Sequence, residues 1–571
     1  MRSFAAGPVP MSRVVRLRPW QKAALDRFEA AGASSPDFLA VATPGAGKTT
    51  FALAAALREL RGCSGRRLVI VAPTAHLKLQ WAKAATRFGL HLHPEWSASS
   101  AALAPDMHGI VTTYQQVSTS AAVLARLTSG AMVILDEIHH AGDEKAWGDS
   151  VREAFAPATR RLALSGTPFR SDTSSIPFVR YRHDEAESDF DYGYGDALHD
   201  GRVVRPVYFP RINGFMEWMT PDGNLQAASF DDSLDRIGSA QRLRTALSAE
   251  GEWLPTVLAQ AHERLTELRA TRQPNAGGLV IAADQEHARA IADLMRWRLG
   301  VTATVVLSDD PQASGRITHF ADGTQPWIIA VRMVSEGVDI PRLAIGVYAT
   351  TTTTELFFRQ AVGRLVRWTP GVVKQKAYLF IPDDPRLRTW AHQIADSRRH
   401  SLRTPAEDAD GFVERAEPDP TAFDSMAVAD EQLSLFSALS AVATETSQTG
   451  VIIAGSVFDD DYEHDNDHVV DDLEPSDDLL LDVGALAPPI PGGTATGADG
   501  LSRYERKEAL RIKNAEWARD LARATGMNHG QVNGQLNRLI NLARVDAATV
   551  EQLEQRVSAA EKWWKQLSGR R

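Results

Sequence analysis

The sequence contains one cysteine and no long apolar segment. Cys63 is the only cysteine among the 571 residues, which excludes intrachain disulfides, cysteine zinc fingers and cysteine-bound iron–sulfur clusters. No apolar run approaches the roughly 18 residues that span a bilayer, and the start, MRSFAAGPVPMSR, lacks the apolar core of a secretory signal. We therefore expect a cytoplasmic protein without a membrane partner, in which any metal is a hard ion bound together with a nucleotide.

The negative charge of the chain is concentrated in one segment. The whole chain carries a formal charge of −10 at pH 7, but residues 405–483 contain 22 acidic residues and a single basic residue, Arg415. The rest of the chain is therefore basic, with a net charge of about +11. Because phosphate binding depends on local grooves, the overall charge does not exclude a nucleic-acid partner.

Residues 42–49, with the sequence ATPGAGKT, have the pattern of a phosphate-binding loop. An apolar strand pattern precedes them at residues 38–41, and an alanine-rich helical pattern follows at residues 50–60. Glycines let backbone N–H groups turn toward phosphates, the lysine reaches the outer phosphates, and the last threonine can ligate Mg²⁺. A glycine turn that only happens to precede a helix is the alternative, which the flanking strand and helix disfavour. The candidate ATP contacts in this loop are Pro44, Gly45, Ala46, Gly47, Lys48, Thr49 and Thr50.

Two further groups of charged residues fit ATP hydrolysis. Asp136 and Glu137 follow a buried-strand pattern at residues 131–135. The aspartate can hold Mg²⁺, and the glutamate can orient and deprotonate the attacking water. In the second half of the chain, Arg364 and Arg367 lie three residues apart on a helical pattern, so both can reach charge that develops on a γ-phosphoryl group. The alternatives are a solvated Asp-Glu turn and a basic helix face paired with surface carboxylates.

Strand and helix patterns alternate in two regions of the chain, with polar residues at the ends of the strands. This alternation predicts an α/β fold with two tandem parallel-sheet domains whose ligands lie along the carboxyl ends of the strands. An acidic segment with little apolar content and a basic helical region follow. The expected domains are the first α/β domain with a trailing arm at 1–235, a helical connector at 236–275, the second α/β domain at 276–400, a largely flexible acidic segment at 401–500 and a small basic helical domain at 501–571.

Taken in order, the motifs of residues 17 to about 385 resemble those of superfamily 2 helicases and translocases of the DExH type. The matching segments are Arg18–Gln21, Ala42–Thr49, Ala72–Thr74, Thr112–Thr113, Asp136–His139, Ser165–Pro168, Ser335–Ile340 and Gln360–Arg367. The opening Arg-Pro-Trp-Gln, the Asp-Glu-Ile-His box and Ser-Gly-Thr-Pro-Phe-Arg are most similar to the branch that contains type III restriction motor subunits and repair translocases. The resemblance implies two RecA-like domains with ATP and Mg²⁺ as ligands. One departure is Val366, which stands where the family usually has glycine.

The resemblance also implies roles for individual residues. Gln21 would recognise adenine and Arg18 would also bind the nucleotide, while Thr49 and Asp136 would hold Mg²⁺. The catalytic set that it implies consists of Lys48, Asp136, Glu137, His139, Gln360, Arg364 and Arg367. The other residues that it implies are Gly337 and Asp339 in the nucleotide cleft, Ser165 and Thr167 in the coupling of hydrolysis to movement, and Thr74, Thr113 and Ser335 at the nucleic-acid backbone.

Two signals lie outside the helicase motifs. A peptide in the acidic segment is similar to those with which bacterial replication and repair proteins bind the sliding clamp; its residues are Gln432, Leu433, Leu435 and Phe436. An ordinary helix is the alternative, because Leu433, Phe436, Leu439 and Val442 have helical spacing. Near the C-terminus, two helical patterns around Gly526 suggest either a DNA-reading helix-turn-helix or a small helical bundle that packs on the motor domains or on a partner.

These observations together predict an ATP-dependent helicase or translocase in replication, repair or defence. DNA is favoured as its substrate, although backbone contacts alone do not distinguish DNA from RNA. Two alternatives remain at this point. The protein could be an ATP-gated nucleic-acid sensor or binding switch, or a restriction motor subunit that does not separate strands and depends on another subunit for cleavage.

Overall fold

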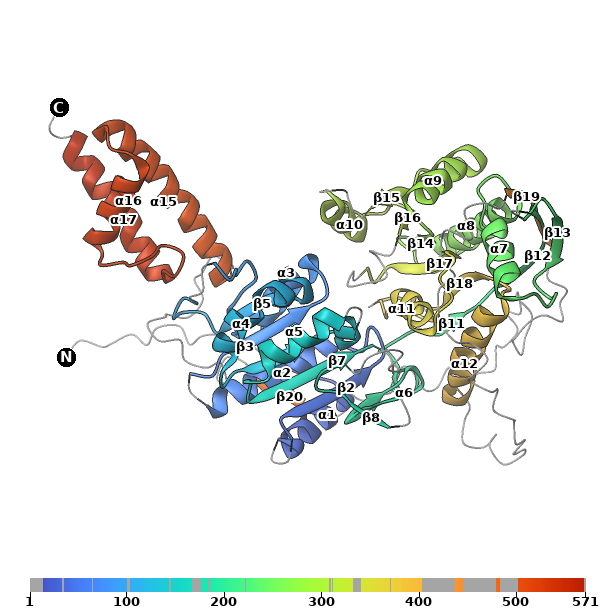
Figure 1. Ribbon diagram of the computed structural model, residues 1–571, viewed down its shortest axis with the longest axis horizontal. Coiled ribbons are helices and arrows are strands. Elements are labelled where there is room, and N and C mark those ends of the chain that lie inside the picture. Colours follow the sequence, from blue (N-terminus) through green and yellow to red (C-terminus); the bar gives the residue numbers. More distant parts are fainter. Residues whose placement is uncertain are drawn as a thin grey trace. The chain divides into compact units, whose positions relative to one another are not determined.

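The computed structural model of this protein (Figure 1) describes residues 14–32, 35–63, 65–99, 103–142, 145–166, 176–182, 185–220, 222–307, 310, 312–331, 340–369, 371–402, 437–444, 479–482 and 502–568. The chain forms two compact units, each built around its own sheet. The first unit contains most of the residues up to 190 together with the C-terminal helices. The second unit contains Val41–Ala46 and Asp191–Leu473.

A seven-stranded sheet in the order β10-β2-β7-β6-β3-β5-β4 forms the centre of the first unit. Its strands are β2 (Asp37–Ala42), β3 (Leu68–Ala72), β4 (Leu92–His93), β5 (Gly109–Thr113), β6 (Met132–Leu135), β7 (Arg160–Ser165) and β10 (Phe190–Tyr192). β3 pairs in parallel with β5 and β6, and the pairs β4–β5 and β6–β7 are also parallel. β3 reads Leu-Val-Ile-Val-Ala and is buried throughout, as expected for a strand covered on both faces. The parallel α/β fold predicted for the first half is confirmed.

Helices follow the strands of this sheet. They are α1 (Pro19–Ala31), α2 (Lys48–Gly62), α3 (Ala75–Thr86), α4 (Tyr114–Thr128), the 3-10 helix η1 (Ile138–Gly142) and α5 (Lys145–Phe155). Pro19 begins α1, where its missing N–H leaves no intrahelical bond unmade. Thr113 ends β5 and caps α4, because its hydroxyl accepts a hydrogen bond from the N–H of Gln116 at 3.2 Å. A short antiparallel pair, β8 (Arg180–Arg182) and β9 (Glu185–Glu187), lies outside the main sheet.

The second unit is built on a nine-stranded sheet in the order β13-β12-β18-β17-β14-β16-β15, in which β11 also pairs with β18 and β19 with β12. Its strands are β11 (Val207–Tyr208), β12 (Arg211–Met219), β13 (Leu225–Ser229), β14 (Gly277–Ala282), β15 (Thr304–Val306), β16 (Trp327–Ala330), β17 (Leu343–Ala349), β18 (Ala377–Pro382) and β19 (Ser437–Thr444). The pairs β14–β16, β14–β17, β15–β16 and β17–β18 are parallel. The second parallel α/β half is thereby confirmed.

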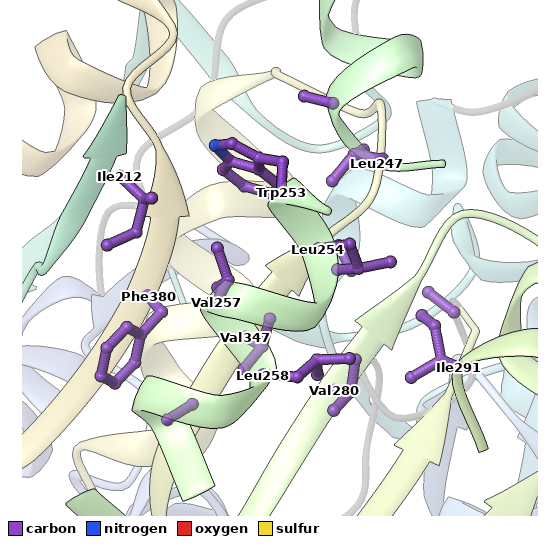
Figure 2. Close-up of a cluster of buried hydrophobic side chains, with 14 of the residues drawn as sticks. Ile212, Leu247, Trp253, Leu254, Val257, Leu258, Val280, Ile291, Val347 and Phe380 are labelled. Carbon is purple, nitrogen blue, oxygen red and sulfur yellow. The ribbon is translucent and has the colours of Figure 1, made fainter. Parts of the chain in front are cut away.

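The helices of the second unit cover this sheet. They are α6 (Tyr194–His199), α7 (Arg236–Ala246), α8 (Trp253–Thr271), α9 (Gln285–Leu299), α10 (Ala313–Asp322), α11 (Glu355–Leu365) and α12 (Pro385–Leu402). Figure 2 shows Trp253, Val257 and Leu258 of α8 packed with Val347 and Phe380 from the sheet. The expected connector 236–275 therefore belongs to the core of the second unit. Each fully buried side chain of this size stabilises the unit by about 1.5–3 kcal/mol. In the described part of either unit, no helix has the length and apolar character that crossing a bilayer requires.

The trailing arm expected for the first domain belongs to the second unit instead. β11 and the start of β12 pair in parallel with β18, so the boundary lies near residue 190 and not at 235. The physical reason is the alternating pattern of β12, which turns Met216 and Trp218 into the apolar core of the second unit. The indole N–H of Trp218 is also bonded there, to the side-chain oxygen of Gln241 at 3.0 Å.

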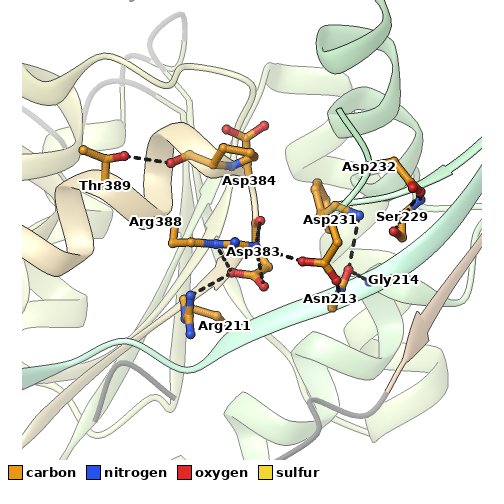
Figure 3. Close-up of polar contacts among 12 residues, drawn as sticks. Arg211, Asn213, Gly214, Ser229, Asp231, Asp232, Asp383, Asp384, Arg388 and Thr389 are labelled. Carbon is orange, nitrogen blue, oxygen red and sulfur yellow. Dashed lines mark hydrogen bonds and ion pairs between the residues drawn. The ribbon is translucent and has the colours of Figure 1, made fainter. Parts of the chain in front are cut away.

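Charged side chains connect β12, the end of β18 and the start of α12 (Figure 3). Arg388 lies 2.9 Å from the carboxylate of Asp383 and 3.3 Å from that of Asp231. Arg211 approaches the same Asp383 carboxylate at 3.3 Å. Burial raises the pKa of Asp383, and the two neighbouring arginines oppose that shift. The cluster therefore fixes α12 to the β12 region through paired charges.

Within residues 401–500, the structure describes two strands, β19 and β20. The expectation that the rest of this segment is flexible concerns residues outside the described part of the chain and stays a prediction. β19 lies antiparallel to β12, and β20 (Leu479–Asp482) lies antiparallel to β1 (Val14–Leu17). β20 reads Leu-Leu-Leu-Asp, and short apolar stretches of this kind gain burial by pairing, as Leu481 does. The helical alternative for Leu439 and Val442 is wrong, because both lie in β19. The clamp-like residues Gln432, Leu433, Leu435 and Phe436 lie outside the described part of the chain.

The C-terminal region forms three helices, α15 (Arg503–Thr525), α16 (His529–Leu539) and α17 (Val550–Ser568). Gly526 ends α15 with a φ of 71°, and Asn528 caps α16 by accepting a hydrogen bond from the N–H of Gln531. Inside the bundle, the buried Arg556 donates to the side-chain oxygens of Asn533 and Asn537 at 2.6 and 2.9 Å. The Asn533 and Asn537 side-chain oxygens therefore stabilise the bundle itself.

A fully buried carboxylate attaches these helices to the first α/β sheet. Asp106 accepts hydrogen bonds from Lys507 Nζ at 2.8 Å and from the N–H of Val550 at 3.1 Å, and it also approaches Arg503 at 3.4 Å. The ring of Tyr504 packs near that of His93, with 5.5 Å between centroids. The C-terminal bundle is thus an attached part of the first unit.

Replacing Asp106 with asparagine should loosen this attachment. The change leaves the buried cations Lys507 and Arg503 without their carboxylate, and breaking a buried ion pair in this way costs about 3–5 kcal/mol. We expect a lower melting temperature and faster hydrogen exchange at the start of α15. Asp149→Asn, at an exposed ion pair with Arg152, is the matched control and should change stability by less than about 0.5 kcal/mol. Unchanged hydrogen exchange in α15 of Asp106→Asn would contradict the role of Asp106 in attaching the C-terminal helices.

Candidate ATP-binding site

The phosphate-loop residues connect β2 to the first turn of α2. Gly45 and Gly47 have φ angles of 86° and 98°, in the left-handed region that favours glycine. A Cβ atom on Gly47 would lie 2.7 Å from Nε2 of Gln21 and so could not be accommodated without a shift. The loop therefore requires glycine for both backbone conformation and space, as a phosphate cradle does.

Gln21 ties the start of α1 to this loop. Its Nε2 donates a hydrogen bond to the carbonyl of Gly47 at 2.9 Å, while its Oε1 accepts one from the N–H of Arg18 at 2.8 Å. These contacts place Arg18 and Gln21 beside the phosphate loop, where the resemblance implies adenine binding. The adenine role of Gln21 and the nucleotide contact of Arg18 stay predictions.

Lys48 and the acidic pair meet at the carboxyl ends of β6 and β7. Lys48 Nζ lies 2.8 Å from Glu137 Oε1, and the N–H of Gly166 donates to Glu137 Oε2 at 2.9 Å. His139 Nδ1 lies 3.7 Å from Glu137 Oε2 and 3.4 Å from the hydroxyl of Ser165. Glu137 has a φ of 47°, an uncommon conformation for a residue with a side chain. The Glu137 carboxylate is therefore close to the predicted site residues Lys48 and His139, and Ser165 lies beside His139.

The two acidic residues have different electrostatic environments. Burial, together with the neighbouring charge of Glu137, raises the pKa of Asp136 to about 6. Burial also acts to raise the pKa of Glu137, but Lys48, His139 and the N–H of Gly166 outweigh it and lower that pKa to about 2. Glu137 is therefore ionised at neutral pH and forms an ion pair with Lys48.

Asp136 is held by two aromatic residues that the sequence did not mark as functional. The indole N–H of Trp81 donates to Asp136 Oδ2 at 2.8 Å, and the hydroxyl of Tyr114 donates to the Asp136 carbonyl at 2.9 Å. Both rings are almost completely buried. A buried tryptophan usually needs a hydrogen-bond partner for its N–H. This requirement is the one feature of the sequence that could have indicated a polar contact for Trp81.

Thr49 and Asp136 offer a hydroxyl and a carboxylate, the hard oxygen donors that suit Mg²⁺. Thr49 lies in the first turn of α2 next to Lys48, and Asp136 directly precedes Glu137. The donor chemistry thus fits a nucleotide-bound magnesium ion.

The candidate nucleic-acid contacts Thr74 and Thr113 occupy equivalent positions. Each is the residue that precedes a helix, Thr74 before α3 and Thr113 before α4, in extended backbone. Helix N-termini offer backbone N–H groups to phosphates. Four other predicted residues lie outside the described part of the chain: Thr167, Ser335, Gly337 and Asp339.

Gln360 and Arg364 lie on α11, but Arg367 does not. The helix ends at Leu365, Val366 caps it, and Arg367 forms an antiparallel bridge with Val204. The expectation of two arginines on one helix face is therefore wrong. The reason is the chain segment at Arg205, whose N–H donates to the Val366 carbonyl at 2.8 Å and holds it outside the helical path.

The fold and this site define a class of protein. Residues 14–170 match the family described as "Type III restriction enzyme, res subunit". The matched residues include the whole phosphate loop and the acidic pair. The chain is a superfamily 2 helicase-like protein.

Comparison with whole proteins gives the particular family. The chain is 41% identical over 573 residues to "Uncharacterized protein MT2985" of Mycobacterium tuberculosis (strain CDC 1551 / Oshkosh), covering 95% of this chain and 92% of that one. It belongs to the same family as that protein. It is 49% identical over 398 residues to "Uncharacterized protein Rv2917" of M. tuberculosis (strain H37Rv), which covers 68% of this chain and 65% of the relative's length.

Among solved structures, a chain described as an HsdR subunit of a type I restriction enzyme from Vibrio vulnificus is similar to 66% of this chain. The similarity covers 65% of that chain, with 18% sequence identity and a TM-score of 0.47.

Proposed function

We propose that this protein is a nucleic-acid-stimulated ATPase that acts as a DNA translocase or helicase. The observation that carries the proposal is the pair of contacts to Glu137, from the phosphate-loop lysine on one side and from the N–H of Gly166 on the other. ATP hydrolysis needs a base that is held beside phosphate-binding groups, and this arrangement supplies one. The match to a helicase-like family over residues 14–170 supports the same class of reaction.

In this proposal, the phosphate loop, Thr49 and the acidic pair share the work of hydrolysis. Backbone N–H groups of residues 44–50 and the ammonium of Lys48 bind the phosphates. Mg²⁺ held by Thr49 and Asp136 would neutralise charge on those phosphates. Glu137 orients the attacking water and accepts its proton. Phosphates that attract Lys48 would reduce its pull on the Glu137 carboxylate, so the base would strengthen when ATP binds.

The remaining predicted residues complete the proposal. Gln360, Arg364 and Arg367, with Gly337 and Asp339, would provide further contacts to the nucleotide. Ser165, Thr167 and His139 would link hydrolysis to movement. Thr74, Thr113 and Ser335 would hold the backbone of the nucleic acid, so that alternating grip moves the protein along a strand.

ATP hydrolysis measured with single-stranded DNA, duplex DNA and RNA tests the proposal. We expect DNA to raise the turnover rate well above the rate without nucleic acid, because the predicted grip residues lie on the same sheet edge as the acidic pair. The same rate with and without each of the three nucleic acids would refute the motor function. Stimulation by RNA alone would reverse the choice of substrate.

A strand-displacement assay beside a translocation assay separates a motor from a binding switch. A translocase or helicase should move along DNA or displace a strand in an ATP-dependent way. Stimulated hydrolysis with neither activity would favour the switch, and translocation without displacement would favour a motor of the restriction-subunit type.

A further inference from the structure

The carboxylate and carbonyl of Asp136 are held from two helices that begin at candidate nucleic-acid contacts. α3 begins after Thr74 and carries Trp81, while α4 begins after Thr113 and carries Tyr114 as its first residue. We propose that Trp81 and Tyr114 are positioning residues that make the acidic pair sensitive to nucleic acid bound at the N-termini of α3 and α4. The inference rests on the proposed function, because it concerns the same ATPase site.

The two hydrogen bonds are well suited to this role. Trp81 Nε1 lies 2.8 Å from Asp136 Oδ2, and Tyr114 Oη lies 2.9 Å from the Asp136 carbonyl. Trp81 is 2% exposed and Tyr114 is 1% exposed, so neither ring can move without its helix. A shift of either helix must therefore move Asp136 or break a buried hydrogen bond, which costs about 1–3 kcal/mol.

The helix N-termini are also connected to each other. Gln116 Oε1 accepts a hydrogen bond from the N–H of Thr113 and one from the hydroxyl of Thr112, both at 3.2 Å. Lys78 Nζ on α3 lies 3.5 Å from the same oxygen. A phosphate that binds near either N-terminus would therefore act on both helices, since they share one polar group.

Backbone geometry carries the effect onward from Asp136 to the proposed base. Glu137 follows Asp136 directly and has the uncommon φ of 47°, so its carboxylate direction depends on where the Asp136 peptide is held. The Tyr114 hydroxyl binds the carbonyl of that peptide. Nucleic acid would thus act on hydrolysis through the orientation of Asp136 and Glu137, a coupling between two separate sites.

The test compares Trp81→Phe and Tyr114→Phe with the intact protein, using the ratio of kcat with saturating single-stranded DNA to kcat without it. Each variant loses one hydrogen-bond donor to Asp136. We expect Trp81→Phe to reduce the ratio at least about 5-fold, the lower end of typical allosteric coupling, and Tyr114→Phe to reduce it in the same direction. Binding of DNA in the absence of nucleotide should stay within about 2-fold, because the contacts at Thr74 and Thr113 are unchanged.

Trp96→Phe is the matched control. Trp96 is buried in the same unit, and its indole N–H makes no hydrogen bond to any residue that the structure describes. It should keep the intact protein's ratio. The inference is overturned if Trp81→Phe lowers kcat with DNA and kcat without DNA by the same factor. It is also overturned if Trp81→Phe and Trp96→Phe change the ratio of the two kcat values equally. If DNA, RNA and duplex DNA all fail to stimulate the intact protein, the proposed function itself fails.

Discussion

Replacing Glu137 with glutamine should lower the rate of ATP hydrolysis by about 100- to 10,000-fold, the range expected when a general base is removed. Glutamine keeps the size of the side chain and one oxygen that can accept from Lys48. Its amide nitrogen cannot accept the hydrogen bond that the N–H of Gly166 now donates to Oε2. Single-turnover hydrolysis with saturating DNA measures the chemical step directly, and a binding titration should show that the variant still binds ATP.

Glu29→Gln is a control for the loss of one carboxylate in the same unit. Glu29 pairs with Arg58 at a partly exposed position and touches none of the site residues described above. Its hydrolysis rate should match that of the intact protein. A Glu137→Gln variant with more than half of the normal rate would show that another group deprotonates the water.

Replacing Arg205 with methionine should destabilise the second unit by about 3 kcal/mol or more. Arg205 is fully buried, and its guanidinium donates to the carbonyls of Leu365 at 2.6 Å, Pro341 at 3.1 Å and Leu343. Each buried acceptor left without a donor costs about 1–3 kcal/mol. Burial lowers the pKa of Arg205 to about 9, so the side chain is still charged at neutral pH and forms charge-assisted bonds. Thermal unfolding measures the loss.

The consequence for function is local to the end of α11. Arg205→Met removes the guanidinium that donates to the Leu365 carbonyl and leaves only the backbone N–H bond to Val366. Hydrogen exchange at residues 362–367 should therefore accelerate. Arg289→Met, on the exposed face of α9, is the control and should change stability by less than about 0.5 kcal/mol. Equal stability of the two variants would mean that the Arg205 guanidinium does not stabilise the second unit.

The local sequence determined the helices and strands of this protein and the phosphate-binding part of its site. The run from Ala42 to Thr49 specifies a strand end, a glycine loop and a helix start within eight residues, so no distant partner is needed to recognise it. Alternating apolar strands and amphipathic helices likewise determined the two parallel sheets, because each such element can be buried only between layers of the other kind. The order of the motifs was sufficient to assign the helicase-like class.

Tertiary structure decided the contacts that join elements far apart in the chain. Trp81 and Asp136 are 55 residues apart, Arg205 and Leu365 160, and Asp106 and Lys507 401. β19 and β20 also find their partners across more than 200 residues. Sequence pattern shows that a tryptophan or an arginine will be buried, but the identity of its partner depends on which polar group the fold leaves within hydrogen-bonding distance. That selection is made only when the layers pack, because a buried donor must then be satisfied by whatever acceptor lies beside it.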